Sequence, residues 1–207
     1  VGNNKDQGFF FFFYLFINPE NKKIAGLAYQ DMWVREWGAG KTKDDKYKKL
    51  PIGKKESFRW IKGAKEARAK LNEKCKMTVI ADRESDIFDL FYLHAKGELG
   101  KNTDLIIRAS RNRKVEEHNE LLFKAIESWE AKGTHQIEIQ QTKTQSKRTA
   151  KLEIRYNTIT FPVPKTHSKK DFAPVPNLYI VDAREINPPS DAEQIHWTII
   201  TTIKVDT

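Results

Sequence analysis

The first strongly apolar segment of the chain is Phe9–Ile17, which reads FFFFFYLFI. A transmembrane helix needs about 20 apolar residues, so this run is too short to cross a bilayer. Its unbroken apolar character predicts a strand that is covered on both faces. A second strand is predicted at Ile24–Val34, and the turn residues Asn18 and Pro19 lie between the two segments. The pattern therefore predicts a β-hairpin near the start of the chain.

The apolar spacing becomes helical after residue 56. A helix is predicted within 56–75 because apolar side chains recur at steps of four, three and four residues, at Trp60, Ala64, Ala67 and Leu71. Short apolar segments then predict strands at 77–81 and 104–109, with an amphipathic helix at 85–95 between them. The order strand, strand, helix, strand, helix, strand indicates an α/β layer built on a mixed sheet.

The pattern changes again after residue 114. A helix is predicted at 119–131, and the alternation of apolar and polar residues at 136–140 and 151–161 is typical of half-exposed antiparallel strands. We interpret 115–176 as an inserted β-rich subdomain. The flanking segments, 1–114 and 177–207, would then form one core, with the last strands at 178–181 and 196–203.

Composition adds information about the partner. The 207 residues carry a net charge of +9, which favours an anionic partner such as nucleic acid. The single cysteine, Cys75, excludes an intramolecular disulfide and a site built from several thiolates, so a reducing compartment is expected. The apolar segments give no reason to expect a membrane partner.

Acidic residues crowd the segment Val79–Leu90, which reads VIADRESDIFDL. Asp82 directly follows the predicted strand 77–81, at the edge of an α/β sheet where ligands gather, and a carboxylate there can bind Mg²⁺. The spacing alone leaves Asp82 between a catalytic and a structural role. The next acids, Glu84, Asp86 and Asp89, would occupy the first turns of the following helix and complement its dipole.

The same segment resembles the second catalytic aspartate block of DDE transposases of the insertion-sequence-four family, which includes the transposon-five transposase. Other blocks of that family have counterparts in the same order along nearly the whole chain. They lie at 8–36, at 56–60 (ESFRW), at 104–114 (DLIIRASRNRK), at 185–189 (EINPP) and at 196–201 (HWTIIT).

This resemblance implies an α/β fold of the RNase H-like type, with a mixed sheet, helices and an inserted antiparallel β subdomain. Members of the family hold two Mg²⁺ or Mn²⁺ ions on two aspartates and one glutamate. They cleave DNA at transposon ends and join the freed 3′-OH to target DNA. They act as homodimers assembled on DNA, so the expected location is the bacterial cytoplasm, in association with the nucleoid.

The resemblance also implies roles for individual residues. Asp82 matches the second catalytic aspartate and is the expected metal ligand. Arg108 matches a residue that contacts a DNA phosphate near the active site, and Trp197 matches a tryptophan on which a flipped base stacks. The remaining expected DNA contacts lie in the basic turn, at Arg111, Arg113 and Lys114. Without the resemblance, core packing of Trp197 and a local ion pair of Arg108 remain the ordinary alternatives.

Two features of the family pattern have no counterpart in these 207 residues: its first aspartate and its final glutamate. We therefore expect an incomplete catalytic site that is inactive in isolation, because one carboxylate does not place two ions. Two alternatives stay open. The chain is a non-catalytic DNA-binding module, or it is an RNase H-like nuclease of another family that draws further acids from Asp31, Asp104 or Glu185.

Overall fold

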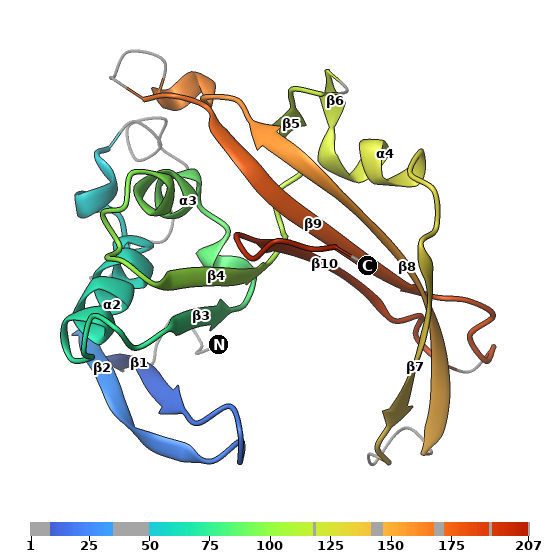
Figure 1. Ribbon diagram of the computed structural model, residues 1–207, viewed down its shortest axis with the longest axis horizontal. Helices are drawn as coiled ribbons and strands as arrows, with labels where there is room; N and C mark the ends of the chain where they lie inside the picture. The colour runs from blue at the N-terminus through green and yellow to red at the C-terminus, as the bar shows by residue number, and fades with distance from the viewer. Residues whose placement is uncertain are drawn as a thin grey trace. The chain divides into compact units, whose positions relative to one another are not determined.

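The computed structural model describes residues 9–34, 50–117, 119–141, 147–167, 172–190 and 192–206 (Figure 1). The chain forms two compact units. The first holds the described residues up to 77 together with 96–103, and the second holds 78–95 and the described residues from 104 onward. Strands and helices occur in the order that the sequence predicts up to residue 108, so the mixed α/β class is confirmed.

The first unit is built on an antiparallel hairpin of β1 (Phe9–Ile17) and β2 (Ile24–Val34). Phe9 lies opposite Val34 in the ladder. The connecting turn closes where the backbone N–H of Lys22 donates to the carbonyl of Asn18 at 2.8 Å. The predicted hairpin is therefore confirmed.

One face of this hairpin packs against α2 (Phe58–Ala69), which follows a short 3₁₀ turn, η1 (Ile52–Lys54). The Phe12 ring meets Trp60 edge-on at 4.7 Å, and the Tyr14 hydroxyl donates to the Trp60 carbonyl at 3.0 Å. A Cβ at Gly63 would lie 2.3 Å from the Tyr14 ring, so only glycine allows this approach. Burial of its ring raises the pKa of Tyr14 well above the ordinary value of a phenol.

The other face of the hairpin corrects one expectation. Phe9 and Phe11 are each 65% exposed and Phe13 is 58% exposed. Because side chains alternate along a strand, Phe12 and Tyr14 face α2 while these odd-numbered residues point away from it. Among the described residues, β1 is thus packed on one face only, and the expectation of a strand covered on both faces is wrong.

The second unit is built on a six-stranded sheet (Figure 1). Its strands lie in the order β3 (Met77–Ala81), β4 (Thr103–Arg108), β10 (His196–Thr201), β9 (Val175–Glu185), β8 (Arg148–Phe161) and β7 (Gly133–Ile139). The pairings from β4 through β10, β9 and β8 to β7 are all antiparallel.

Helices and turns connect these strands. The 3₁₀ turn η2 (Arg83–Ser85) and the helix α3 (Phe88–Ala95) lie between β3 and β4. A two-stranded ladder of β5 (Lys114–Val115) and β6 (Glu120–Leu121) precedes α4 (Leu122–Glu127), which is shorter than the helix predicted at 119–131. A last 3₁₀ turn, η3 (Lys165–His167), follows β8.

The core of the second unit joins α3 to the sheet. Phe91 of α3 is 0% exposed and contacts Phe161 of β8 edge-on, with ring centroids 5.8 Å apart. Ile107 of β4, Ile180 of β9 and Ile200 of β10 are also 0% exposed. Burial of each such side chain contributes roughly 1.5–3 kcal/mol. This packing fixes the turn that carries Asp82 relative to the strands beside it.

The segment interpreted as an insertion contributes to the same sheet. β8 pairs with β9 from Leu152 opposite Glu185 to Phe161 opposite Val175. β7 continues the sheet beyond β8. The RNase H-like arrangement, the insertion at 115–176 and the boundaries with 1–114 and 177–207 stay predictions.

Candidate active site

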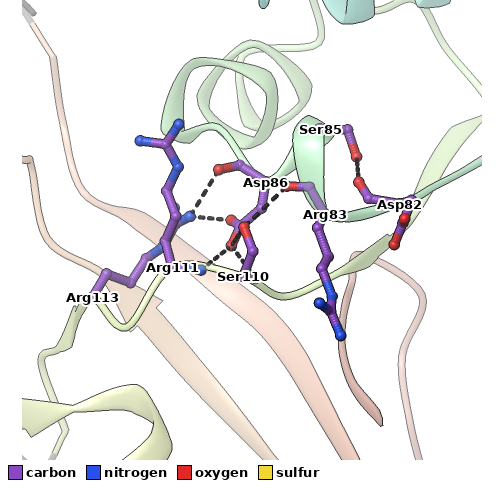
Figure 2. Close-up of polar contacts among 7 residues, drawn as sticks. All are labelled: Asp82, Arg83, Ser85, Asp86, Ser110, Arg111 and Arg113. Atoms are coloured by element: carbon purple, nitrogen blue, oxygen red, sulfur yellow. Dashed lines mark hydrogen bonds and ion pairs between the residues drawn. The ribbon is translucent and has the colours of Figure 1, made fainter. Parts of the chain in front are cut away.

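Asp82 stands directly after β3, and its carboxylate faces solvent. Its backbone is extended, with φ −83° and ψ −176°, and its side chain is 70% exposed. The Asp82 carbonyl accepts hydrogen bonds from the backbone N–H of Ser85 at 3.0 Å and from the Ser85 hydroxyl at 2.6 Å. Ser85 is fully buried, and these two bonds hold the Asp82 backbone through its carbonyl (Figure 2). The Asp82 carboxylate takes no part in them.

Arg108 is the cation beside this carboxylate. It ends β4, the neighbour of β3 in the sheet, and its Nη1 lies 3.8 Å from Oδ1 of Asp82. Both side chains are substantially exposed, so the pair itself contributes little stability. The two residues that the sequence analysis placed nearest the chemistry thus lie together at one edge of the sheet.

Asp86 has a different role from Asp82, although only three residues lie between them in the sequence. Its carboxylate is 0% exposed and accepts the backbone N–H groups of Ser110 and Arg111, each at 2.8 Å. It also contacts the guanidinium of Arg113 (Figure 2). Burial lowers the pKa of Arg113, and the neighbouring Asp86 opposes that shift. Asp86 therefore fixes the turn after β4 to the turn after β3.

This arrangement corrects the interpretation of the acids as a helix start. α3 begins at Phe88, so Glu84 and Asp86 precede the helix, and Asp86 holds a turn instead of complementing a helix dipole. Asp89 does lie in the first turn of α3, and its carboxylate meets the His167 ring at 3.1 Å.

The predicted DNA contacts in the basic turn separate into two groups. Arg111 and Lys114 are exposed. Arg113 is directed inward, where its guanidinium lies 4.5 Å from the centre of the Phe161 ring and contacts Asp86. A role of Arg113 in DNA contact stays a prediction, but in this structure its guanidinium is already engaged within the fold.

Trp197 lies on β10 and is 38% exposed. In the ladder Arg108 is opposite Ile199, and Trp197 is two residues before Ile199 on the same strand. Since side chains two residues apart share a face, the register places Trp197 and Arg108 on one face of the sheet. A half-exposed indole is compatible with stacking on a base, which stays a prediction.

Sequence reasoning missed a second group of polar residues on the opposite face of β9 and β10. Thr198 pairs with Asp182 and His196 pairs with Arg184, so these four side chains share one face. They line a pocket of about 370 Å³, which we term the β9–β10 pocket, and its other lining residues include Arg83, Arg108 and Glu127. The alternation in the sequence indicates that His196 and Thr198 share one face of their strand and that Trp197 lies on the other. The residues of β9 that face His196 and Thr198 depend on the pairing register, which cannot be read from the sequence.

The described residues supply only part of a two-ion metal site. Asp82 is an exposed carboxylate and suits a hard divalent cation as one ligand. Across the described ranges, however, no three His, Cys, Asp or Glu side chains come together in a way that could hold a metal ion. A two-ion site needs several carboxylates, so Asp82 and its described neighbours do not form one by themselves.

The acids considered as alternative partners have other contacts. Asp31 accepts hydrogen bonds from the Tyr29 hydroxyl and from the Met32 N–H. Glu185 is 2% exposed and is paired with Arg148. Arg148 lowers the pKa of Glu185 by its hydrogen bond, against the opposing effect of burial. Asp104 lies within hydrogen-bonding distance of the Thr202 hydroxyl, at 3.4 Å.

No model of a known protein family matches this chain. In the part of the chain that the structure describes, no helix has the length and apolar character needed to cross a membrane.

Proposed function

We propose that this chain is the central part of the catalytic domain of a DDE-type DNA transposase. In this proposal Asp82 is one of the carboxylates that hold Mg²⁺ or Mn²⁺, and the remaining ligands come from outside the described residues. The DNA partners are the transposon ends and the target, and the complete protein works as a homodimer on DNA in the bacterial cytoplasm.

The observation that carries the proposal is the position of Asp82 beside Arg108. An exposed carboxylate ends a strand next to an arginine, and the side chains lie 3.8 Å apart. A metal-binding acid and a phosphate-binding cation are needed side by side where a phosphodiester is cleaved. The net charge of +9 and the exposed side chains of Arg111 and Lys114 supply the further attraction for a DNA backbone.

The second candidate is a non-catalytic DNA-binding module. It is favoured by the lack of a three-residue metal-binding group among the described residues. Both candidates predict salt-sensitive DNA binding, and both predict no cleavage by this chain alone. They differ in whether Asp82 has a specific part in the response to a divalent cation.

The experiment that separates them is a DNA-binding titration with and without Mg²⁺. At constant ionic strength, Mg²⁺ should strengthen duplex binding by the wild-type chain and leave binding by the Asp82→Asn variant unchanged. Equal responses of the two proteins would favour the DNA-binding module. Cleavage of DNA by the 207-residue chain that is lost in Asp82→Asn would instead support a nuclease with another set of acids.

A further inference from the structure

The β9–β10 pocket contains a buried carboxylate with one unused oxygen. Asp182 is 1% exposed. Its Oδ1 accepts hydrogen bonds from Nε2 of His196 at 2.8 Å and from the Thr198 hydroxyl at 2.6 Å. Its Oδ2 is buried and receives no hydrogen bond from any described residue. A buried acceptor without a donor is costly, so Oδ2 is an acceptor that a bound ligand can satisfy.

The same pocket is lined by three arginines, Arg83, Arg108 and Arg184, and by one further acid, Glu127, so cations outnumber the carboxylates of Asp182 and Glu127. Arg184 lies opposite His196 in the ladder, and its buried Nε has no hydrogen-bond partner among the described residues. Arg83 lines the pocket from η2, and its side chain extends away from the Asp86 carboxylate (Figure 2). Guanidinium groups favour phosphate because their N–H donors match its oxygens.

We infer that the β9–β10 pocket binds one unpaired nucleotide of DNA, whose exocyclic amino group donates to Oδ2 of Asp182 and whose phosphate lies on Arg83 and Arg184. The inference rests on the proposed function, because that function supplies DNA as the partner. A volume of about 370 Å³ lies within the range of small-ligand sites. Trp197 points to the other face of β10 and does not line the pocket, whereas Arg108 does, so the pocket adjoins the Asp82–Arg108 pair without including the residue expected for base stacking.

The chemistry of Asp182 selects among the bases. Cytosine, adenine and guanine carry an amino group that can donate a hydrogen bond to a single carboxylate oxygen. Thymine has no amino group, and its N3–H is flanked by two carbonyl oxygens that a carboxylate repels. Because Oδ1 is already occupied by His196 and Thr198, the pocket should prefer an amino-bearing base to thymine.

The test compares three single-stranded oligonucleotides of equal length by fluorescence anisotropy with the full chain. They contain deoxycytidine, N4,N4-dimethyldeoxycytidine or thymidine. The deoxycytidine strand should bind about tenfold more tightly than the other two, as expected for one hydrogen bond to a charged acceptor. The dimethylated base has no amino N–H, so this oligonucleotide tests the hydrogen bond to Oδ2 of Asp182 without a change in the protein.

Two variants sharpen the result. Asp182→Asn should place an amide donor where Oδ2 now lies and shift the preference toward thymidine. Arg184→Gln should weaken the binding of all three oligonucleotides by the same factor. Glu130→Gln is the matched control, because Glu130 is 83% exposed and pairs only with Lys132 among the described residues. This control should keep the wild-type preference, and melting curves should verify that each variant is folded.

The outcomes distinguish this inference from the proposed function. Equal binding of all three strands with a strong salt dependence would overturn the nucleotide pocket and leave DNA binding intact. Failure to bind any DNA would overturn both. If Asp182→Asn does not fold, the comparison of cytidine with its dimethyl analogue on the wild-type chain still decides the question.

Discussion

The buried carboxylate of Asp86 contacts the guanidinium of Arg113 and ties the turn after β3 to the turn after β4. Asp82 follows β3 and Arg108 ends β4, directly before these two turns; the Asp82 side chain is exposed and that of Arg108 is partly exposed. The acids of the VIADRESDIFDL segment thus have separate tasks. Asp86 builds the support, and Asp82 is left available at the edge of the sheet.

Loss of the Asp86 charge should destabilise the second unit. Asp86→Asn leaves the buried Arg113 cation without its counter-charge, for which we expect a loss of about 3–5 kcal/mol in the free energy of unfolding. Urea denaturation followed by circular dichroism measures it. The exposed control Glu130→Gln should change stability by no more than about 0.5 kcal/mol. Equal changes in the free energy of unfolding for the two substitutions would show that the contact between Asp86 and Arg113 does not stabilise the fold.

A double-mutant cycle should reveal the coupling of the pair. Arg113→Met removes the buried cation and keeps an apolar stem near Phe161. The combination with Asp86→Asn should therefore be less destabilised than the sum of the single variants, by roughly 0.5–3 kcal/mol. Additive losses in the same urea experiments would mean that the two side chains act independently.

The packing of α2 on the hairpin predicts a sensitive glycine. Gly63→Ala would place a methyl group against the Tyr14 ring, and we expect a loss of about 1–3 kcal/mol. Gly53→Ala is the matched control, because no heavy atom lies within 4 Å of its ideal Cβ position. Thermal unfolding compares the two, and similar melting temperatures would contradict the close contact.

The ion pair of Glu185 with Arg148 predicts a pH dependence of stability. The Arg148 hydrogen bond lowers the pKa of folded Glu185 below its usual value of about 4.3. The stabilisation is therefore complete above the unfolded-state pKa and is lost as the pH falls through the lower pKa of the folded state.

Glu185→Gln should remove this contribution. The variant should be less stable than wild type near neutral pH, and the difference should shrink as the pH drops below about 4.3. Urea unfolding at a series of pH values measures both effects. Glu138→Gln, in an exposed pair with Lys147, serves as the control. A constant difference at every pH would argue against the ion pair as the cause.

Local patterns predicted much of the fold. The apolar runs located β1, β2, β3 and β4 to within a residue or two, because strand character is encoded in neighbouring residues. They also placed Asp82 correctly at the end of β3. The same patterns predicted too long a helix around α4 and a β1 strand covered on both faces, because helix ends and burial depend on tertiary partners.

The different roles of Asp82 and Asp86 could not be predicted from local patterns. The donors to Asp86 come from Ser110 and Arg111, more than 20 residues along the chain. The β9–β10 pocket was hidden for a similar reason, since Asp182 and Thr198 meet only through the pairing of two strands. Sequence spacing reports contacts within one element, whereas these sites depend on register between elements.

The central claim is that DNA lies along the edge carrying Asp82 and Arg108. Its most direct test is duplex DNA binding measured by anisotropy over a salt series in metal-free buffer. Arg108→Gln should weaken binding and reduce the salt slope by about one. Asp82→Asn should strengthen binding, because a negative charge near the phosphates is removed. The control Lys132→Gln should leave affinity and slope close to wild type. Unchanged affinity and slope in both Arg108→Gln and Asp82→Asn would contradict the account.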